Sequence, residues 1–344
     1  MFDWLAELLG YVMYGCLWLV GNNYVIALLI FALAMQILLC PFGIKQQRNM
    51  VKQAHLRPKE MAIRKKYAGR NDAVTIQKLR TEIMQLHQDM GYSATSGCLP
   101  MLLQLILIFP IYSVTIRPLE FVVGLSSQAC NVLLGVAADS GHVFSGSSAQ
   151  VQLAGWLGDN RASISKDLII ARNGGERISI YDAVNSTEVI PDVTLFGQDL
   201  GATPFGSLGE VYWWLFLIPF INLGLTYLSQ YLSQKMQYKS TLQEAGGPGA
   251  SMKIMMIALP LLSLVFTGTF AAAIGIYWIF RTILSMIQQY ILHKAMPYPV
   301  FTEQDYKNAE REMKGKAPKR APDWYVGGSR EIRSLHHIDD DDED

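Results

Sequence analysis

The residues with a potential for chemistry in this sequence are polar side chains inside long apolar stretches. Burying such a side chain in a membrane is costly, so its presence there suggests a functional role. Gln36, Asn222 and Arg281 each lie roughly 17 Å along their stretch, near the middle of a bilayer core of about 30 Å. We therefore predict a water-containing, positively charged cavity between helices. Its candidate lining residues are Gln36, Gln104, Asn222, Tyr277 and Arg281.

The same polar residues have a second interpretation, because amide side chains also join neighbouring membrane helices by hydrogen bonds. One stripe at helical spacing carries four of the polar residues of the last stretch: Tyr277, Arg281, Ser285 and Gln288. For Gln36, Gln104 and Asn222 both interpretations stay open. For Arg281 the cavity is favoured, since no acidic residue lies deep enough in a predicted span to pair with it.

Motifs for catalysis are missing from the sequence. It contains no H-E-x-x-H zinc motif, no Walker phosphate-binding loop and no G-x-S-x-G nucleophile motif. The four cysteines form no C-x-x-C pair, and the six histidines are scattered over loops, the hairpin and the tail. We therefore expect a protein that is not an enzyme, with no catalytic residue, no metal site and no cofactor.

The composition indicates an integral membrane protein. Apolar residues make up 51% of the 344 residues and charged residues 17%, against roughly 25% charged in a typical soluble domain. A membrane-spanning helix needs about 20 mainly apolar residues, which gives five candidate spans. The predicted spans cover residues 24–43, 97–123 and 206–228, followed by two spans within residues 254–291 that turn near Gly268.

The segments outside the spans complete the predicted domain organisation. Residues 1–23 lack Lys and Arg and carry Trp4 and Trp18, which favours a helix lying in the membrane interface; a sixth span is the alternative. The other segments are a helical hairpin at 44–96, an insertion at 124–205 with a β-hairpin near 168–181, a loop at 229–253, and a tail at 292–344 with an acidic end.

The distribution of charge orients the chain, although its net charge is zero. Residues 44–96 contain 11 Lys and Arg against 4 Asp and Glu, whereas residues 125–210 contain 4 against 9. Lys and Arg concentrate in cytoplasmic loops, so the first segment is predicted to be cytoplasmic and the second external. Residues 229–253, with 3 Lys and one Glu, agree with this orientation. Five spans then place the N-terminus outside and the C-terminus in the cytoplasm.

The 44–96 hairpin is predicted to contain two helices. Pro58 suits a first helical turn, and a turn follows near Gly69. Beyond that turn, apolar residues recur at the alternating three- and four-residue spacing of a coiled-coil seam: Ile76, Leu79, Ile83, Leu86 and Met90. The segment is either a solvated loop whose charges only set the topology or a basic hairpin that contacts lipid headgroups, RNA or a client chain. We favour the second interpretation.

Several strings together resemble the YidC family of membrane protein insertases, which includes the Oxa proteins of mitochondria and the Albino proteins of chloroplasts. The most specific string is GCLPMLLQ at residues 97–104. The other strings are Gly21-Asn-Asn-Tyr24, Cys40-Pro41-Phe42, Arg57-Pro58, Lys65-Lys66-Tyr67, Phe196-Gly-Gln-Asp-Leu200, Ile276-Tyr-Trp278 and Gln288-Gln-Tyr290.

The resemblance implies a fold. It is an all-α polytopic protein of the bacterial cell membrane, with five transmembrane helices around a hydrophilic groove, a cytoplasmic helical hairpin and a small extracellular α/β insertion. The groove opens to the cytoplasm and to lipid and is closed to the outside.

The resemblance also implies a function as insertase and chaperone. A nascent membrane protein places its polar segment in the groove while its apolar segment moves into the lipid bilayer, alone or beside the Sec translocon. The ribosome is a further candidate partner, and no direct DNA binding is implied. The hairpin receives clients, with these candidate residues: Arg57, Pro58, Lys65, Lys66 and Arg70.

One departure from the family concerns the groove charge. Bacterial relatives typically carry an arginine in the first span, where this sequence has Gln36. Here Arg281 stands in the fifth span, followed by Thr282 where Asn is common, so Thr282 joins the candidate groove residues. We hypothesise that Arg281 supplies the charge that Gln36 does not. A second departure is the 124–205 insertion, which is longer than is typical of Gram-positive relatives.

Two other classes of function compete with this interpretation. A small-solute transporter or channel is the main alternative, although transporters commonly contain internal repeats and the five unequal spans show none. A scaffold protein whose external module binds a partner is the second.

Overall fold

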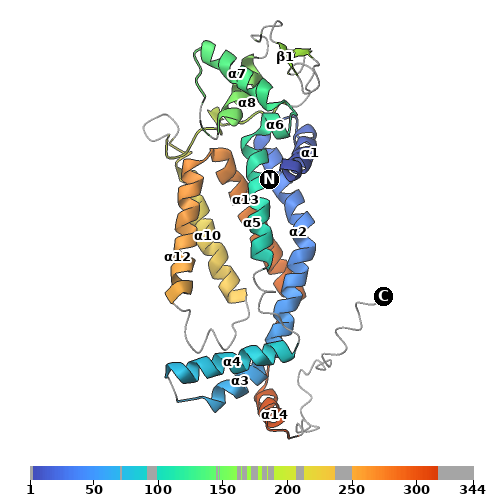
Figure 1. The fold of residues 1–344 in the computed structure, drawn as a ribbon, viewed down its shortest axis with the longest axis vertical. Coiled ribbons are helices and arrows are strands. Elements are labelled where there is room, and N and C mark those ends of the chain that lie inside the picture. The colour runs from blue at the N-terminus through green and yellow to red at the C-terminus, as the bar shows by residue number, and fades with distance from the viewer. Residues whose placement is uncertain are drawn as a thin grey trace, which may run out of the picture. The chain divides into compact units, whose positions relative to one another are not determined.

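The computed structural model is mainly helical, with two short antiparallel sheets (Figure 1). The chain divides into a larger unit, residues 1–54 with 91–298, and a smaller unit, residues 55–90 with 299–344. The structure describes residues 3–69, 72–90, 99–144, 146, 148–160, 164, 169–171, 177–179, 184, 190–206, 213–236 and 250–316.

Two helices open the larger unit. α1 (Asp3–Leu19) and α2 (Tyr24–His55) are joined by a tight turn in which Gly21 and Asn22 have positive φ angles. α2 continues past the predicted end of the first span at residue 43, and Pro41 lies inside the helix without ending it. Among the described helices, α2 alone is long and apolar enough to cross a membrane by length and composition.

Four further long helices overlap the remaining predicted spans: α5 (Leu99–Ile116), α10 (Leu217–Met236), α12 (Ala250–Thr269) and α13 (Ala272–Ala295). α10 packs against both α12 and α13, and α13 also contacts α5 (Figure 1). The turn between α12 and α13 lies at Phe270 and Ala271, two residues beyond Gly268, near which it was predicted. Gly268 stays helical, and it is the close approach of the Phe205 ring that leaves no room for a β-carbon there.

The described residues of the insertion between α5 and α10 include these helices and a β-hairpin: α6 (Pro118–Phe121), α7 (Ser127–Asp139), α8 (Ala149–Asn160), β1 (Ile169–Ala171) and β2 (Arg177–Ser179). β1 and β2 pair antiparallel with Ile170 opposite Ile178, which confirms the predicted β-hairpin. The Ser126 hydroxyl caps α7 by accepting a hydrogen bond from the Ala129 amide. α7 and α8 contact each other, and each buries apolar side chains, such as Leu133 and Leu157.

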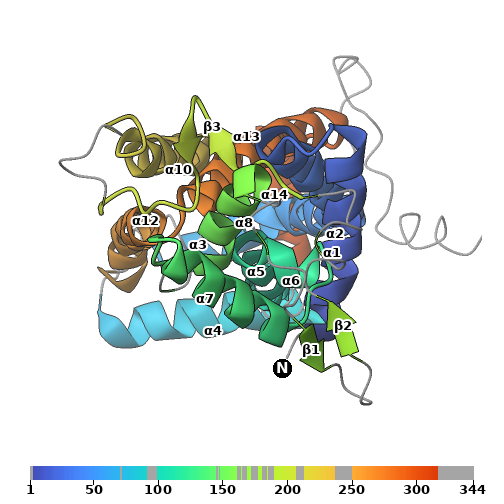
Figure 2. The ribbon, with the colours of Figure 1, turned by 90° about the horizontal axis from the view of Figure 1, so that it is seen from above.

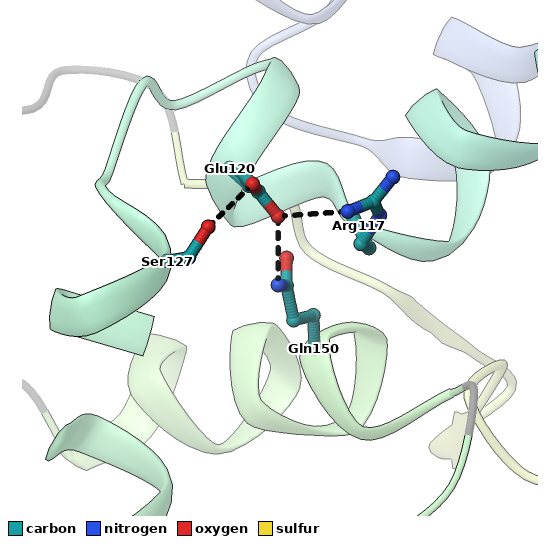
Figure 3. A network of polar contacts seen from close by, with 4 residues as sticks. All are labelled: Arg117, Glu120, Ser127 and Gln150. Carbon is teal, nitrogen blue, oxygen red and sulfur yellow. Dashed lines mark hydrogen bonds and ion pairs between the residues drawn. The ribbon is translucent and has the colours of Figure 1, made fainter. Parts of the chain in front are cut away.

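One carboxylate fixes this insertion to the end of α5 (Figure 3). Glu120 on α6 accepts hydrogen bonds from Ser127 Oγ at 2.6 Å and Gln150 Nε2 at 3.3 Å. It also pairs with an Arg117 guanidinium nitrogen at 3.3 Å. Figure 3 shows these donors converging on the carboxylate from α7, from α8 and from the residue before α6. Glu120 therefore holds the first residues of α7 and α8 against α6.

Residues 192–206 form a strap across the ends of several helices. Within it, β3 (Thr194–Leu195) and β4 (Gln198–Asp199) pair around a two-residue loop. The strap bonds through its backbone to the start of α2 and to the α12–α13 turn. These bonds are Tyr24 N to Asp192 O, Asp192 N to Asn22 O, Phe205 N to Gly268 O, Ala272 N to Ala202 O and Ala273 N to Leu200 O, at 2.8–3.1 Å.

Burial in three long helices is concentrated next to the strap. The buried side chains of α13 run from Ala272 to Tyr277, and those of α10 are Ile218, Pro219 and Asn222. In the predicted first span, the last buried side chain of α2 is Met35. We call the remaining parts of these helices, residues 36–46, 223–236 and 278–295, the far half. All of its described side chains are partly or fully exposed.

The smaller unit contains α3 (Arg57–Lys66), α4 (Ala73–Asp89) and α14 (Glu303–Met313). The two predicted hairpin helices are confirmed, and α4 turns Leu79 and Ile83 of the predicted seam into the interior. α14 was not expected within the tail. It begins with a capping box between Thr302 and Asp305 and contacts α3.

Candidate functional site

The candidate cavity residues on α2 and α13 lie close together. The amide of Gln36 donates a hydrogen bond from Nε2 to Oε1 of Gln288, which joins the two helices in the far half. Gly43 permits the close approach, since a β-carbon there would lie 2.8 Å from Gln288 Nε2. This Nε2 is buried and has no hydrogen-bond partner in the part of the chain that the structure describes.

Tyr277 stands where the closely packed part of α13 ends. Its side chain is buried, and its ring lies 6.0 Å from the ring of Phe31 on α2. Arg281 follows one turn later on the same face, and Gln288 two turns after that. Both Tyr277 and Gln288 contact α2, so Arg281 lies on the stripe of α13 that faces α2.

The Arg281 side chain is partly exposed, as is that of its neighbour Thr282. Within the described ranges, no hydrogen bond or ion pair involves the Arg281 guanidinium. A guanidinium is strongly solvated, so leaving it without a protein partner requires access to water or to a partner that arrives later. The chemistry of this stripe is that of hydrogen-bond donors and one fixed positive charge.

Asn222 occupies a different place from the other candidates. Its side chain is 1% exposed, and its Nδ2 donates to the backbone carbonyl oxygen of Gly275 at 3.0 Å. This bond ties α10 to α13 next to the strap, in the manner of the helix-joining interpretation. Gly275 itself faces Ile218 of α10, where a β-carbon would lie 2.5 Å from the isoleucine methyl group.

Two predicted site residues lie beyond what the structure describes. Gln104 is on α5, but its side chain is outside the described set. Arg70 falls outside the described residues altogether.

The basic candidates of the hairpin are engaged in the smaller unit. Pro58 and the preceding Arg57 form the first turn of α3, and Pro58 is buried. Lys65 Nζ lies 2.5 Å from Glu310 Oε1 of α14, and Lys66 Nζ lies 2.8 Å from Glu82 Oε1 of α4. Both lysines are well exposed, so each pair contributes little stability and leaves the ammonium accessible to a competing anion.

The hairpin ion pairs shift the titration of their members. The hydrogen bond from Lys65 holds the pKa of the Glu310 carboxyl below its ordinary value. For Glu82, burial raises the pKa, but the hydrogen bonds from Lys66 and Tyr67 outweigh burial and the net pKa is lowered. Both carboxylates are therefore ionised at neutral pH and offset part of the positive charge of the hairpin.

Three polar residues were not among the predicted site residues. Gln288 was visible as a member of the stripe with Tyr277 and Arg281, but its bond to Gln36 was not. Glu120 appeared only as a charge at the end of a span. The third is Glu60, which is fully buried in α3 and lies 2.7 Å from His87 Nε2 of α4. A glutamate in a polar helix gives no sequence signal for burial.

No group of three or more His, Cys, Asp or Glu side chains suited to a metal ion occurs in the described ranges. Cys16, Cys40 and Cys130 are free. The positively charged stripe and the basic hairpin are therefore the two chemically distinctive features of the described chain.

Comparison with known proteins places this arrangement among membrane proteins. Residues 17–142 and 177–299 match the family model described as 60Kd inner membrane protein. The unmatched residues 143–176 include α8 and β1.

Curated relatives agree with the family match. The chain is 22% identical over 275 residues to membrane protein insertase YidC 2 of Bacillus anthracis, covering 80% of this chain and 73% of the relative. It is 24% identical over 275 residues to membrane protein insertase YidC of Clostridium perfringens, covering 79% of each. Over a shorter stretch of 114 residues, it is 34% identical to the YidC insertase of Oceanobacillus iheyensis, covering 31% of this chain and 45% of the relative.

Proposed function

Because this chain belongs to the 60Kd inner membrane protein family, that of the YidC membrane protein insertases, we propose that it inserts client proteins through a polar groove in the far half of the bundle. Family membership supports a bacterial membrane protein that acts on other membrane proteins. The groove, its residues and its opening are our proposal.

One observation carries the proposal, namely the contrast in burial along α2 and α13. Next to the strap, both helices bury apolar side chains such as Phe31 and Tyr277. Beyond these, the same two helices present Gln36, Arg281 and Gln288 where the chain is partly exposed. A cavity closed at one end and polar at the other accepts a polar segment without passing it freely across the membrane.

The proposed membrane arrangement has five spans. They are α2 up to about residue 43, α5, α10, α12 and α13, with the insertion outside the cell and residues 44–96 and 229–253 in the cytoplasm. α1 lies in the outer interface, since Trp4, Tyr11 and Trp18 are each more than 60% exposed on a mainly apolar helix. The strap end is then external, and the far half faces the cytoplasm.

Within this groove, we assign Arg281 the role of the fixed positive charge. It attracts an acidic or polar client segment, and Gln36, Gln288, Tyr277 and Thr282 supply hydrogen bonds around it. Asn222, which is buried and bonded to Gly275, closes the groove at its outer end. The polar segment enters from the cytoplasm, while the apolar segment of the client moves into lipid, as a chaperoned insertion step.

The basic hairpin meets the client or the ribosome first. Lys65 and Lys66 are exposed, and their partners Glu310 and Glu82 are surface carboxylates that an anionic ligand can replace. Cooperation with the Sec translocon belongs to the same proposal, for clients whose external segments are too large for the groove.

Site-specific photocrosslinking to a nascent client tests this proposal. A photoreactive residue is placed at position 36 or 281, with Ile37 as the matched control, since Ile37 is 65% exposed at the same depth on another face of α2. Ribosomes stalled on a short-tailed membrane protein should crosslink through the polar client segment at 36 and 281. Equal crosslinking at 37, or none at 36 and 281, would contradict the groove.

A further inference from the structure

The β3–β4 loop of the strap holds an aromatic side chain in an unusual backbone conformation. Thr194 pairs with Asp199 and Leu195 with Gln198, so Phe196 and Gly197 form a two-residue hairpin turn. Both have positive φ, 53° at Phe196 and 75° at Gly197. A turn of this kind favours Asn-Gly, since a residue with a bulky β-carbon is unfavourable in the left-handed region.

Burial in the core does not explain this conformation of Phe196. Its side chain is 84% exposed, which makes it one of the most exposed large apolar side chains of the described chain. The hairpin that carries Phe196 is fixed to the protein core at its base. Val193 and Leu200, on either side of the two strands, are fully buried, and Leu200 N donates to Val193 O at 3.0 Å. The turn therefore projects an aromatic ring from a fixed base.

Phe196 continues an aromatic surface at the start of α10. Its ring lies 5.8 Å from that of Trp214 in an edge-to-face arrangement, and the adjacent Trp213 is 71% exposed. The next exposed apolar side chains along the chain are Leu217, Phe220 and Ile221, which share one face of α10 by their helical spacing. Seen from above in Figure 2, β3 lies beside α10 at the edge of the bundle.

We propose that the Phe196 turn and Trp213 form an anchor in the outer lipid–water interface, with the headgroup–acyl boundary of phospholipid as their ligand. Aromatic side chains favour this region, where a ring meets apolar chains on one side and water on the other. The exposed apolar face of α10, which begins directly after Trp213 and Trp214 in the chain, supports lipid rather than protein as the occupant. This inference rests on the proposed function, in which α10 crosses the membrane with its first turn outside.

An anchor of this kind would set the height of the strap. The strap bonds directly to α2 and to the α12–α13 turn, so its depth fixes the closed end of the groove relative to the membrane. A turn optimised for stability alone would carry Asn at position 196.

Spin-label depth measurements in liposomes of phosphatidylethanolamine and phosphatidylglycerol test the anchor. In a variant whose four cysteines are replaced by alanine, single cysteines are introduced by Phe196→Cys, Ile221→Cys and Val143→Cys and labelled with a nitroxide. Val143 is the matched control, an apolar residue 78% exposed on the insertion and remote in sequence from α10.

The label at 196 should collide more often with oxygen, which concentrates in lipid, than with a water-soluble nickel complex. Its ratio of oxygen collisions to nickel collisions should lie between the ratio at 221 and the ratio at 143. If the label at 221 is in lipid and the label at 196 is as accessible to water as the label at 143, the anchor proposal fails while α10 still spans the membrane. If 221 is also wet, the proposed membrane arrangement itself fails. Strong dipolar broadening at 196 would indicate a second copy of the chain and would overturn the lipid assignment.

A pair of substitutions separates anchoring from folding. Phe196→Asn suits the turn better, so a purely structural role predicts an equal or higher Tm and no change in depth. The anchor predicts that Phe196→Asn shifts a label at Trp213→Cys towards water without lowering the Tm, whereas Phe196→Trp leaves the depth unchanged. An unchanged depth in both variants would overturn the proposal.

Discussion

Polar groups at the two ends of the same helices differ in how they are hydrogen-bonded. Next to the strap, the polar groups are satisfied within the protein, as in the bond from Asn222 to Gly275 O and the backbone bonds of the strap. In the far half, Gln36 and Gln288 pair with each other, and the Arg281 guanidinium makes no hydrogen bond or ion pair within the described ranges. Under the proposed function, this difference suits one end for rigidity and the other for contact with an incoming client.

This comparison has a direct consequence for mutations. Substitutions next to the strap should lower the free energy of unfolding with little direct effect on chemistry. Substitutions in the far half should lower the rate of client insertion with little effect on stability.

The largest effect is expected where a backbone atom blocks any side chain. In Gly10→Ala, the new methyl group would meet the carbonyl oxygen of Phe121, and backbone on both sides cannot move aside. We expect a loss of about 3 kcal/mol in the free energy of unfolding in detergent. Gly15→Ala is the control on the same helix, because nothing lies near its β-carbon position, and it should be neutral or slightly stabilising.

Arg281→Ala tests the far half. Loss of the fixed charge should slow insertion of a client that does not need the Sec translocon by about tenfold, equivalent to about 1.4 kcal/mol. The unfolding free energy should stay within about 0.5 kcal/mol of the parent, since no described group loses a bond. Arg281→Lys retains the charge and should keep most of the rate. Full activity of Arg281→Ala would refute the role of this charge.

Asn222→Ala should have the opposite effects to Arg281→Ala, with a lower stability and an almost unchanged insertion rate. The Gly275 carbonyl oxygen loses its side-chain donor between α10 and α13, which should cost about 1 kcal/mol of unfolding free energy. Insertion, measured under conditions where the variant stays folded, should remain close to the parent rate. A variant that is fully stable but slow would move Asn222 into the client-binding groove.

Gly43→Ala gives the smallest expected effect and sharpens the contrast with Gly10. Its β-carbon would displace only the end of the flexible Gln288 side chain, so unfolding should change by less than about 0.5 kcal/mol. A destabilisation as large as that of Gly10→Ala would show that the far half is packed as firmly as the contact between α1 and α6.

Much of the site could be predicted from spacing alone. The interval between Tyr277, Arg281 and Gln288 on one helix fixes their common face, whatever the fold around them. The pairing of Gln36 with Gln288 could not be predicted, because it depends on the register between two helices far apart in sequence. The same holds for Asn222, whose partner is a backbone carbonyl that every residue possesses.

The fold shows the same division between local and non-local information. The β1–β2 hairpin was predicted from a local pattern around Asn-Gly-Gly. The strap was missed, since its strands contain two residues each and their bonds are to remote segments. The turn predicted near Gly268 lies two residues later, and Gly268 itself is a site of close packing against Phe205. For α14, the signal was present in the capping box of Thr302 and Asp305 but lay within a charged tail.

Accessibility of single cysteines to a membrane-impermeant maleimide tests the central claim most directly. Gln36→Cys and Thr282→Cys represent the far half, and Ala273→Cys, at a fully buried position, represents the strap end. In membrane vesicles, the thiols at 36 and 282 should react when the reagent is on the cytoplasmic side and not when it is outside, while 273 resists both. Labelling of 36 from the outside, or no labelling from either side, would contradict a groove closed at the strap and open to the cytoplasm.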